Sequence, residues 1–145
     1  MIYKDAEHEV FYKSCLERSR LKDVYRKSLF YCLGIDPSIR AHIERLYDFE
    51  DESIKLEGIN EAWQTGGSTA VTRLAFNLYS GSTPTICLYE ENEEDCLQEC
   101  SQYAVSDIFS RSICNMEYLM EAVRLRYQSD FENKVKPANK KSIGK

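Results

Sequence analysis

The sequence contains no run approaching the roughly 18 consecutive apolar residues that a membrane-spanning helix needs. It also lacks the apolar stretch of a secretory signal, because the segment Met1–Glu7 becomes polar at once. These absences predict a soluble protein of the cytoplasm with no membrane partner. Its 145 residues suffice for one domain with a continuous hydrophobic core, which needs no metal or disulfide to be stable.

Signatures of catalysis are also scarce. The chain has two histidines, and neither His8 nor His42 lies near a serine, a cysteine and an acid in a nucleophile motif. His8 lies between two glutamates and is expected to be exposed, whereas His42 is expected at the boundary of an apolar face. We therefore predict a non-enzymatic protein that has no cofactor.

The cysteines do not have the spacing of a common zinc site. Three residues separate Cys96 from Cys100, where such sites have two, and no histidine is near them in the sequence. At helical spacing two thiolates can still share a metal, which is the alternative. Because we expect a reducing compartment, we predict no metal and six unpaired thiols: Cys15, Cys32, Cys87, Cys96, Cys100 and Cys114.

Charge is distributed unevenly along the chain. The net charge of −5 divides into +5 on residues 134–145 and −10 on residues 1–133. Residues 1–133 are predicted to be a single helical domain, and residues 134–145 a flexible basic tail without apolar periodicity. A body this acidic repels phosphate backbones, so we predict no direct nucleic-acid binding by the folded part. The tail contains five lysines: Lys134, Lys136, Lys140, Lys141 and Lys145.

The spacing of apolar residues favours helices. Intervals of three and four residues recur, whereas sustained alternation is missing, so we predict a mainly α, compact bundle of about five to six helices. Residues 85–89 can form one short strand or an extended segment. Helices are expected near residues 5–18, 21–33, 37–47, 69–80 and 113–127, with Gly34 and Gly81 as helix ends. Residues 58–63 fit a short helical stretch, and residues 103–109 fit a short helix or a turn.

A Gly-Gly turn after the only tryptophan, Trp63, is the most informative local feature. Gly66 and Gly67 give the backbone freedom, Ser68 can cap the following helix, and Arg73 lies about one turn into it. Turn amides together with this arginine can hold an anion, although the turn matches neither a Walker loop nor a dinucleotide fingerprint. The alternative is a sharp connection, with Trp63 in the core and Arg73 paired with an acid.

A cluster of acids provides the second candidate site. It is either a solvated loop or the first turn of a helix, where acids are favoured. Together with ten tyrosines, a residue type enriched at interfaces, it indicates a surface for a protein partner that is basic. The cluster consists of Glu90, Glu91, Glu93, Glu94 and Asp95.

Four segments resemble an uncharacterised family of small proteins from Firmicutes and their mobile elements. They are Tyr47–Glu50, Trp63–Ser68, Arg73–Tyr79 and Ala122–Tyr127. The resemblance covers about residues 5–128. It implies a small cytosolic protein, and it supplies no catalytic residues.

Two functions are open at this point. The first is a non-enzymatic interaction factor, encoded by a phage or mobile element, that binds a host nucleic-acid enzyme or defence protein through an acidic, tyrosine-rich surface. The alternative is a small-ligand sensor or an enzyme built around the turn Trp63–Ser68. The oligomeric state is left open.

Overall fold

The computed structural model describes residues 1–86 and 93–143, and its described part is mainly helical, as predicted. Seven α-helices are joined by three 3-10 turns and one two-stranded sheet. In chain order the elements are α1 (Ala6–Arg18), α2 (Val24–Leu33), α3 (Pro37–Ala41), η1 (Ile43–Arg45), β1 (Tyr47–Asp48), β2 (Ser53–Ile54), η2 (Leu56–Asn60), α4 (Gly66–Ser80), α5 (Glu93–Ser101), α6 (Val105–Arg111), η3 (Ile113–Asn115) and α7 (Met116–Ile143).

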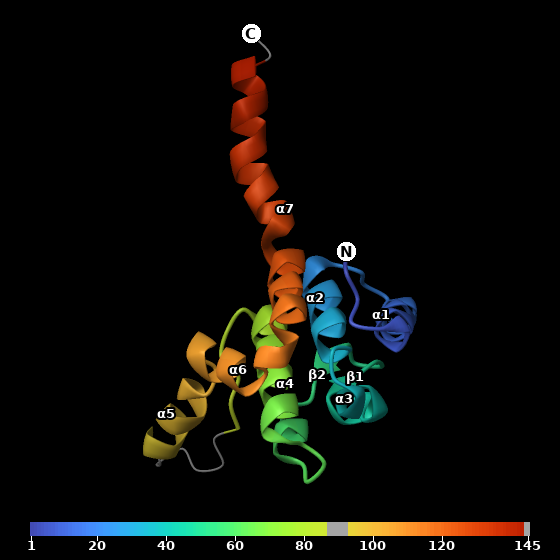
Figure 1. Ribbon diagram of the computed structural model, residues 1–145, viewed down its shortest axis with the longest axis vertical. Helices are drawn as coiled ribbons and strands as arrows, with labels where there is room; N and C mark the ends of the chain where they lie inside the picture. Colours follow the sequence, from blue (N-terminus) through green and yellow to red (C-terminus); the bar gives the residue numbers. More distant parts are fainter. Residues whose placement is uncertain (87–92, 144–145) are drawn as a thin grey trace.

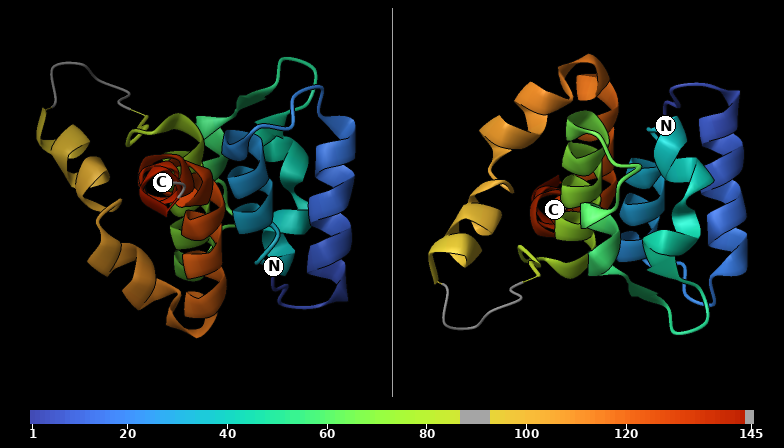
Figure 2. Two further views of the ribbon diagram at one scale, coloured as in Figure 1. Left: turned by 90° about the horizontal axis from the view of Figure 1, so that it is seen from above. Right: turned by 90° about the horizontal axis from the view of Figure 1, so that it is seen from below.

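Helices α2 and α4 form the centre of the molecule. Helix α2 packs against α4, α7 and α1, and α4 also packs against α6. Figure 2 shows α1 and the α5–α6 pair on opposite sides of these two helices. The segment Leu29–Leu33 of α2 and Phe76 of α4 are fully buried, as is Leu119 of α7. Burial of such side chains, at about 1.5–3 kcal/mol each, holds the layers together.

Polar caps define most helix ends. Asp5, Asp23 and Asp36 accept hydrogen bonds from backbone N–H groups in the first turns of α1, α2 and α3. Gly34 follows α2, and Gly81 ends α4 with a φ of 70°, a conformation that favours glycine. The predicted ends at both glycines are confirmed.

The helix predicted for residues 37–47 is wrong in its second half. Helix α3 ends at Ala41, and the chain continues through η1 into a β-hairpin in which Tyr47 lies opposite Ile54. Ile39 and Leu46 are both buried, as their spacing predicts, but the backbone between them is not one continuous helix. The hairpin turn includes Glu52 at a φ of 57°, a conformation stabilised by hydrogen bonds from Arg26 of α2 and Tyr79 of α4.

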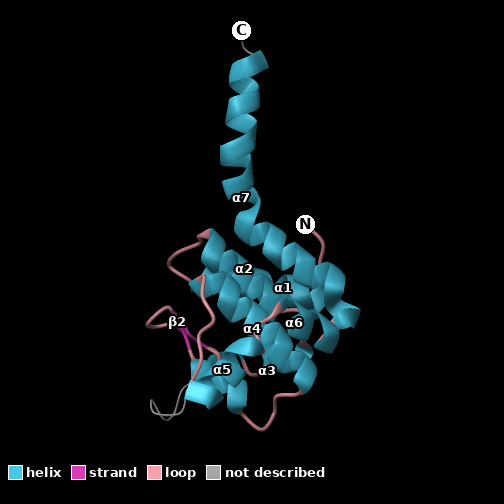
Figure 3. Ribbon diagram, turned by 90° about the vertical axis from the view of Figure 1, so that its left-hand side faces the viewer, coloured by secondary structure: helices cyan, strands magenta, loops and turns pink. Residues whose placement is uncertain are grey.

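Helix α7 is longer than the sequence indicates. It continues through residues 134–143, so the predicted division of the chain at residue 133 does not coincide with the end of an element. Figures 1 and 3 show the outer half of α7 projecting away from the other helices. No helix among the described residues combines the length and the apolar character of a membrane span.

The prediction of six unpaired thiols is wrong for Cys96, which is disulfide-bonded. It assumed a reducing compartment, which cysteine spacing alone does not establish. The cysteines Cys15, Cys32, Cys100 and Cys114 are free. Cys87 lies outside the described residues, as does most of the strand or extended segment expected at residues 85–89. The part of that segment that is described, Thr85 and Ile86, belongs to no helix or strand.

Candidate functional site

A capping box fixes the beginning of α4. The Ser68 N–H donates to Thr65 Oγ1 over 3.1 Å, and the Thr65 N–H donates to Ser68 Oγ over 2.8 Å. The N-cap is therefore Thr65, three residues before the predicted Ser68. Neither Gly66 nor Gly67 donates its N–H to an acceptor within the described residues. These two amides are available to an anion.

The conformational freedom expected of Gly66 and Gly67 is not used. Gly81 is the glycine with a positive φ among the described residues. A methyl group at Gly66 would lie 4.0 Å from Arg111 Nη1, and one at Gly67 would lie 3.5 Å from the Arg111 carbonyl, both of them ordinary contacts. Glycine is therefore not required by backbone strain at either position, which corrects the prediction.

A polar hollow of about 280 Å³ opens beside this first turn. It brings together α4, the loop after η2 and the α5–α6 segment. Its lining includes Glu61, Thr65, Gly66, Arg73, Gln102 and Arg111. Gln102 and Arg111, which follow Arg73 by 29 and 38 positions in the sequence, thus line the same hollow as Arg73.

Arg73 is the distinctive residue of this hollow. It is only 7% exposed, yet it forms no hydrogen bond and no ion pair with the part of the chain that the structure describes. Burial lowers the pKa of its guanidinium, Tyr103 acts in the opposite direction, and Arg111 lowers the pKa further. Glu99 and Asp107 attract it only from beyond ion-pair distance. A largely buried arginine without an acidic partner is rare, and the guanidinium of Arg73 reaches solvent only through the hollow that it lines.

The other charges of the hollow leave it cationic. Arg111 is exposed and has no ion pair within the described residues. The acid in the lining, Glu61, is occupied by Arg45, whose Nε donates to Glu61 Oε2 over 2.9 Å, and by Trp63 Nε1 at 2.8 Å. The bond from Arg45, followed by that from Trp63, lowers the pKa of Glu61 to about 2. Two guanidinium groups and the start of a helix therefore face this space without a carboxylate to neutralise them.

The structure brings only part of the predicted turn site together. Gly66 and Arg73 line the hollow, whereas Ser68 is buried in the capping box. The ring of Trp63 stacks on His42, with centroids 4.3 Å apart and planes at 4°, and it does not line the hollow. Sequence reasoning missed Arg111, because no local pattern links α6 to the start of α4.

The acidic candidate site is only partly described. Glu90 and Glu91 lie outside the described residues. Glu93 begins α5, and Glu94 and Asp95 follow in its first turn, where both are exposed. A helix start therefore accounts for the part of the cluster that is seen.

The expected tyrosine-rich surface is not found among the described residues. Tyr12, Tyr31 and Tyr47 belong to the core. Tyr25 and Tyr127 are the exposed tyrosines of the part described, and each has the Arg126 guanidinium over its ring. Tyrosine content here reflects aromatic packing in the interior.

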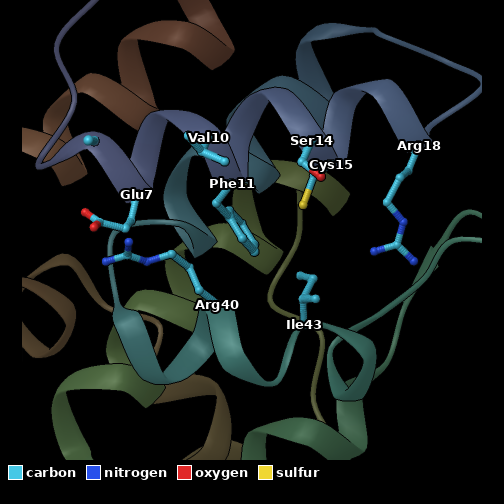
Figure 4. Close-up of a pocket in the computed structure, with 9 residues that line it drawn as sticks. Glu7, Val10, Phe11, Ser14, Cys15, Arg18, Arg40 and Ile43 are labelled. Carbon is cyan, nitrogen blue, oxygen red and sulfur yellow. The ribbon is translucent and has the colours of Figure 1, made fainter.

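A second hollow of about 460 Å³ lies between α1 and the α3–η1 segment. Figure 4 shows Phe11 and Ile43 in its wall, with Arg40 and Arg18 toward its two ends. Both arginines are already paired, Arg40 with Asp5 at 3.2 Å and Arg18 with Glu44 at 2.7 Å.

The thiol in this groove is not a nucleophile. Burial raises the pKa of Cys15 to about 12, so the reactive thiolate is scarce at neutral pH. Among the residues that the structure describes, no three His, Cys, Asp or Glu side chains gather as metal ligands do. This second hollow is therefore an apolar surface between two ion pairs, and a weaker candidate than the hollow beside α4.

His8 is fully buried, which contradicts the expectation that it is exposed. Its Nε2 lies 2.7 Å from the Tyr31 carbonyl, and the Lys4 N–H donates to its Nδ1 over 3.0 Å. These partners fit a neutral ring with its proton on Nε2. Burial lowers the pKa of His8, the bond to Tyr31 opposes that effect, and Arg40 adds to it.

This burial makes stability depend on pH. In the unfolded chain His8 takes up a proton near its ordinary pKa of 6.5, whereas the folded chain resists protonation until a lower pH. The free energy of unfolding is therefore expected to fall as the pH is lowered from 8 to 5, with thermal unfolding followed by circular dichroism. A His8→Gln variant should lose most of this slope, and equal slopes in both proteins would refute the assignment.

Fold and hollow together define a small, mainly helical protein with a cationic site at the start of a buried helix. The chain belongs to a family of unknown function, DUF6075, whose model matches residues 1–139. The resemblance to an uncharacterised family is thereby confirmed, over a longer span than the predicted 5–128. No curated protein and no solved structure matches the chain.

Proposed function

We propose that the protein binds a ligand bearing a phosphate or carboxylate group in the hollow at the start of α4. One observation carries this proposal: Arg73 is buried there without an acidic partner. A guanidinium presents five donors in a planar fork, which matches the oxygens of such a group. A bound oxyanion would supply the charge that the fold itself leaves out.

The remaining donors surround the same space. Gly66, at the positive end of the α4 dipole, lines the hollow, and Arg111 Nη1 lies near it. The capping box holds the first turn in place before any ligand arrives. Because the donors are already oriented, little ordering accompanies binding.

Binding fits this residue set better than catalysis does. Arginine does not exchange its proton near neutral pH, so neither Arg73 nor Arg111 is a general acid or base. Glu61 is held as a carboxylate by Arg45 and Trp63, which leaves it unsuited to accepting a proton. The proposed function is therefore that of a small-ligand-binding protein.

Two other interpretations stay predictions from the sequence. One is a basic protein partner for the acidic cluster, with the exposure of Glu94 and Asp95 as its structural support. The other is an origin in a phage or mobile element and action on a host protein. A cytoplasmic location likewise stays a prediction.

Replacing Arg73 by methionine tests the proposal, because it separates stability from binding. Without oxyanions the Arg73→Met protein is expected to be at least as stable as the wild type, since a partly desolvated charge without a protein acceptor is removed. With inorganic phosphate, the wild-type protein should gain about 2.7 kcal/mol at 100 times its dissociation constant. The variant should gain almost none. Thermal unfolding and calorimetric titration with phosphate measure both effects.

The matched control is Arg18→Met, which removes an exposed arginine that bonds to Glu44. It should leave the response to phosphate unchanged. Titrations with phosphate and with citrate, each against sodium chloride of equal ionic strength, distinguish the two oxyanion classes from general salt effects. A wild-type protein that responds to neither anion, or an Arg73→Met variant that responds as the wild type does, would refute the proposed function.

A further inference from the structure

The outward face of α7 is unusually apolar for a surface helix. Leu119 and Ala122 are buried against the body, as expected for the inward face. On the opposite side, where polar residues are the rule, five large apolar side chains are 40–58% exposed. They follow one another at intervals of four and seven residues: Met116, Met120, Tyr127, Phe131 and Val135.

The outer half of α7 lacks support from its own chain. Figures 1 and 3 show it standing clear of the other described elements. A helix of this length without tertiary packing is only marginally stable in water, because packing of an apolar face supplies most of a helix's stability. The outer half therefore needs a partner along its apolar stripe.

The stripe is complementary to itself when reversed. In an antiparallel pair related by a two-fold axis between Leu125 and Arg126, residues whose numbers add to the same total lie at the same level. Met116 then lies opposite Val135, and Met120 lies opposite Phe131. Every large apolar residue at the ends of the stripe thus meets another from the second copy.

Charge favours the same register. Glu117 is exposed, without an ion-pair partner in the described part of the chain, and it falls opposite Lys134 of a second copy. At the centre of the pair, Arg124 falls opposite the Tyr127 ring, an arrangement suited to a cation–π contact.

We infer that the occupant of this face is a second copy of the chain, and that two α7 helices pair antiparallel into a symmetric dimer. The contact is isologous, so each residue acts twice. The projecting half of each helix packs along the inner half of its partner, on the side away from the core. This dimer is independent of the oxyanion site, because Arg73 and Arg111 take no part in it.

The test is the mass in solution of the full-length chain, from low micromolar to submillimolar concentration, by light scattering and sedimentation equilibrium. The wild-type chain is expected to be a dimer. Phe131→Glu, at a position outside the folded core, should weaken the dimer about 100-fold, because the apolar contact with Met120 is lost twice and two charges are buried in its place. The control Leu97→Glu places the same charge on α5, at a residue 70% exposed, and should keep the dimer.

A charge exchange tests the orientation. Glu117→Lys and Lys134→Glu should each weaken the dimer, because like charges then face each other across the axis. The double variant should restore it to near the wild-type affinity. In a parallel pair, residue 117 would face residue 117 and residue 134 would face residue 134 of the second copy, so like charges would meet in the wild type and in every variant. The double variant would then show no recovery over the single variants. Failure of this rescue would overturn the antiparallel arrangement, and a monomer at all concentrations would overturn the dimer itself.

Discussion

Glu52→Gln is expected to lower the free energy of unfolding by about 3 kcal/mol, as is typical when one partner of a buried ion pair is removed. Arg26 Nε lies 2.8 Å from Glu52 Oε2, and both side chains are nearly buried. The other carboxylate oxygen accepts the Arg20 N–H over 2.7 Å. The variant keeps the Arg26 bond to Asp23, which places the expected cost at the lower end of the usual range.

The pH dependence of this effect has a defined sign. Burial alone would raise the pKa of Glu52, but the Arg20 amide and the charge of Arg26 outweigh burial and lower it. The stabilisation is therefore complete above the ordinary pKa of about 4.5 and is lost as the pH falls through the lowered value. At acid pH the wild-type and Glu52→Gln proteins should approach each other in stability.

Urea unfolding measures this prediction, and a double-mutant cycle with Arg26→Met separates the pair from its surroundings. The double variant should be less destabilised than the sum of the single ones, because neither charge is then left buried alone. The control Glu44→Gln removes an exposed acid bonded to Arg18 and should change stability by about 0.5 kcal/mol or less. Additive losses in the cycle would contradict the proposed coupling.

Gly58→Ala is expected to destabilise the fold by about 1–3 kcal/mol through overpacking. A methyl group at this buried position would overlap the Arg45 carbonyl oxygen and lie 2.5 Å from Leu46 Cδ2. The Gly58 carbonyl also accepts a bond from Gln64 Nε2 at 3.1 Å, which links η2 to the start of α4. The substitution should therefore weaken phosphate binding as well as stability.

The comparison for this variant is Gly66→Ala, where the added methyl group has no neighbour nearer than 4.0 Å. Alanine is the better helix former, so Gly66→Ala should leave the melting temperature unchanged or raise it. Chemical unfolding of both proteins decides the matter. Equal stabilities would mean that the chain around Gly58 relaxes freely, contrary to the close contact described here.

The sequence predicted those helices whose capping residues, apolar stripe and terminal glycine all lie close together in the chain. Helix α4 has an apolar stripe, a polar start and a terminal glycine between Thr65 and Gly81, and all were found near their predicted places. The hairpin after η1 has no such signal. Its turn depends on Arg26 and Tyr79, which bind Glu52 from helices 26 and 27 residues away in the sequence.

The same limit applies to the candidate site. The sequence identified Gly66 and Arg73, because a helix start and an arginine one or two turns later are readable locally. It assigned Trp63 and Ser68 to the same site, although both are used within the protein. That Arg73 is left without an acid follows only from the packing of α6 against α4, which no spacing rule shows.

The stacking of Trp63 on His42 gives the protein its own optical reporter. Trp63 is the sole tryptophan, so all indole fluorescence comes from one ring, whose N–H is bonded to Glu61 in the wall of the hollow. A ligand that displaces Glu61 changes the polarity around that ring, and the emission spectrum changes with it. Binding of the proposed oxyanion in the hollow is therefore expected to change the tryptophan emission of the unlabelled protein.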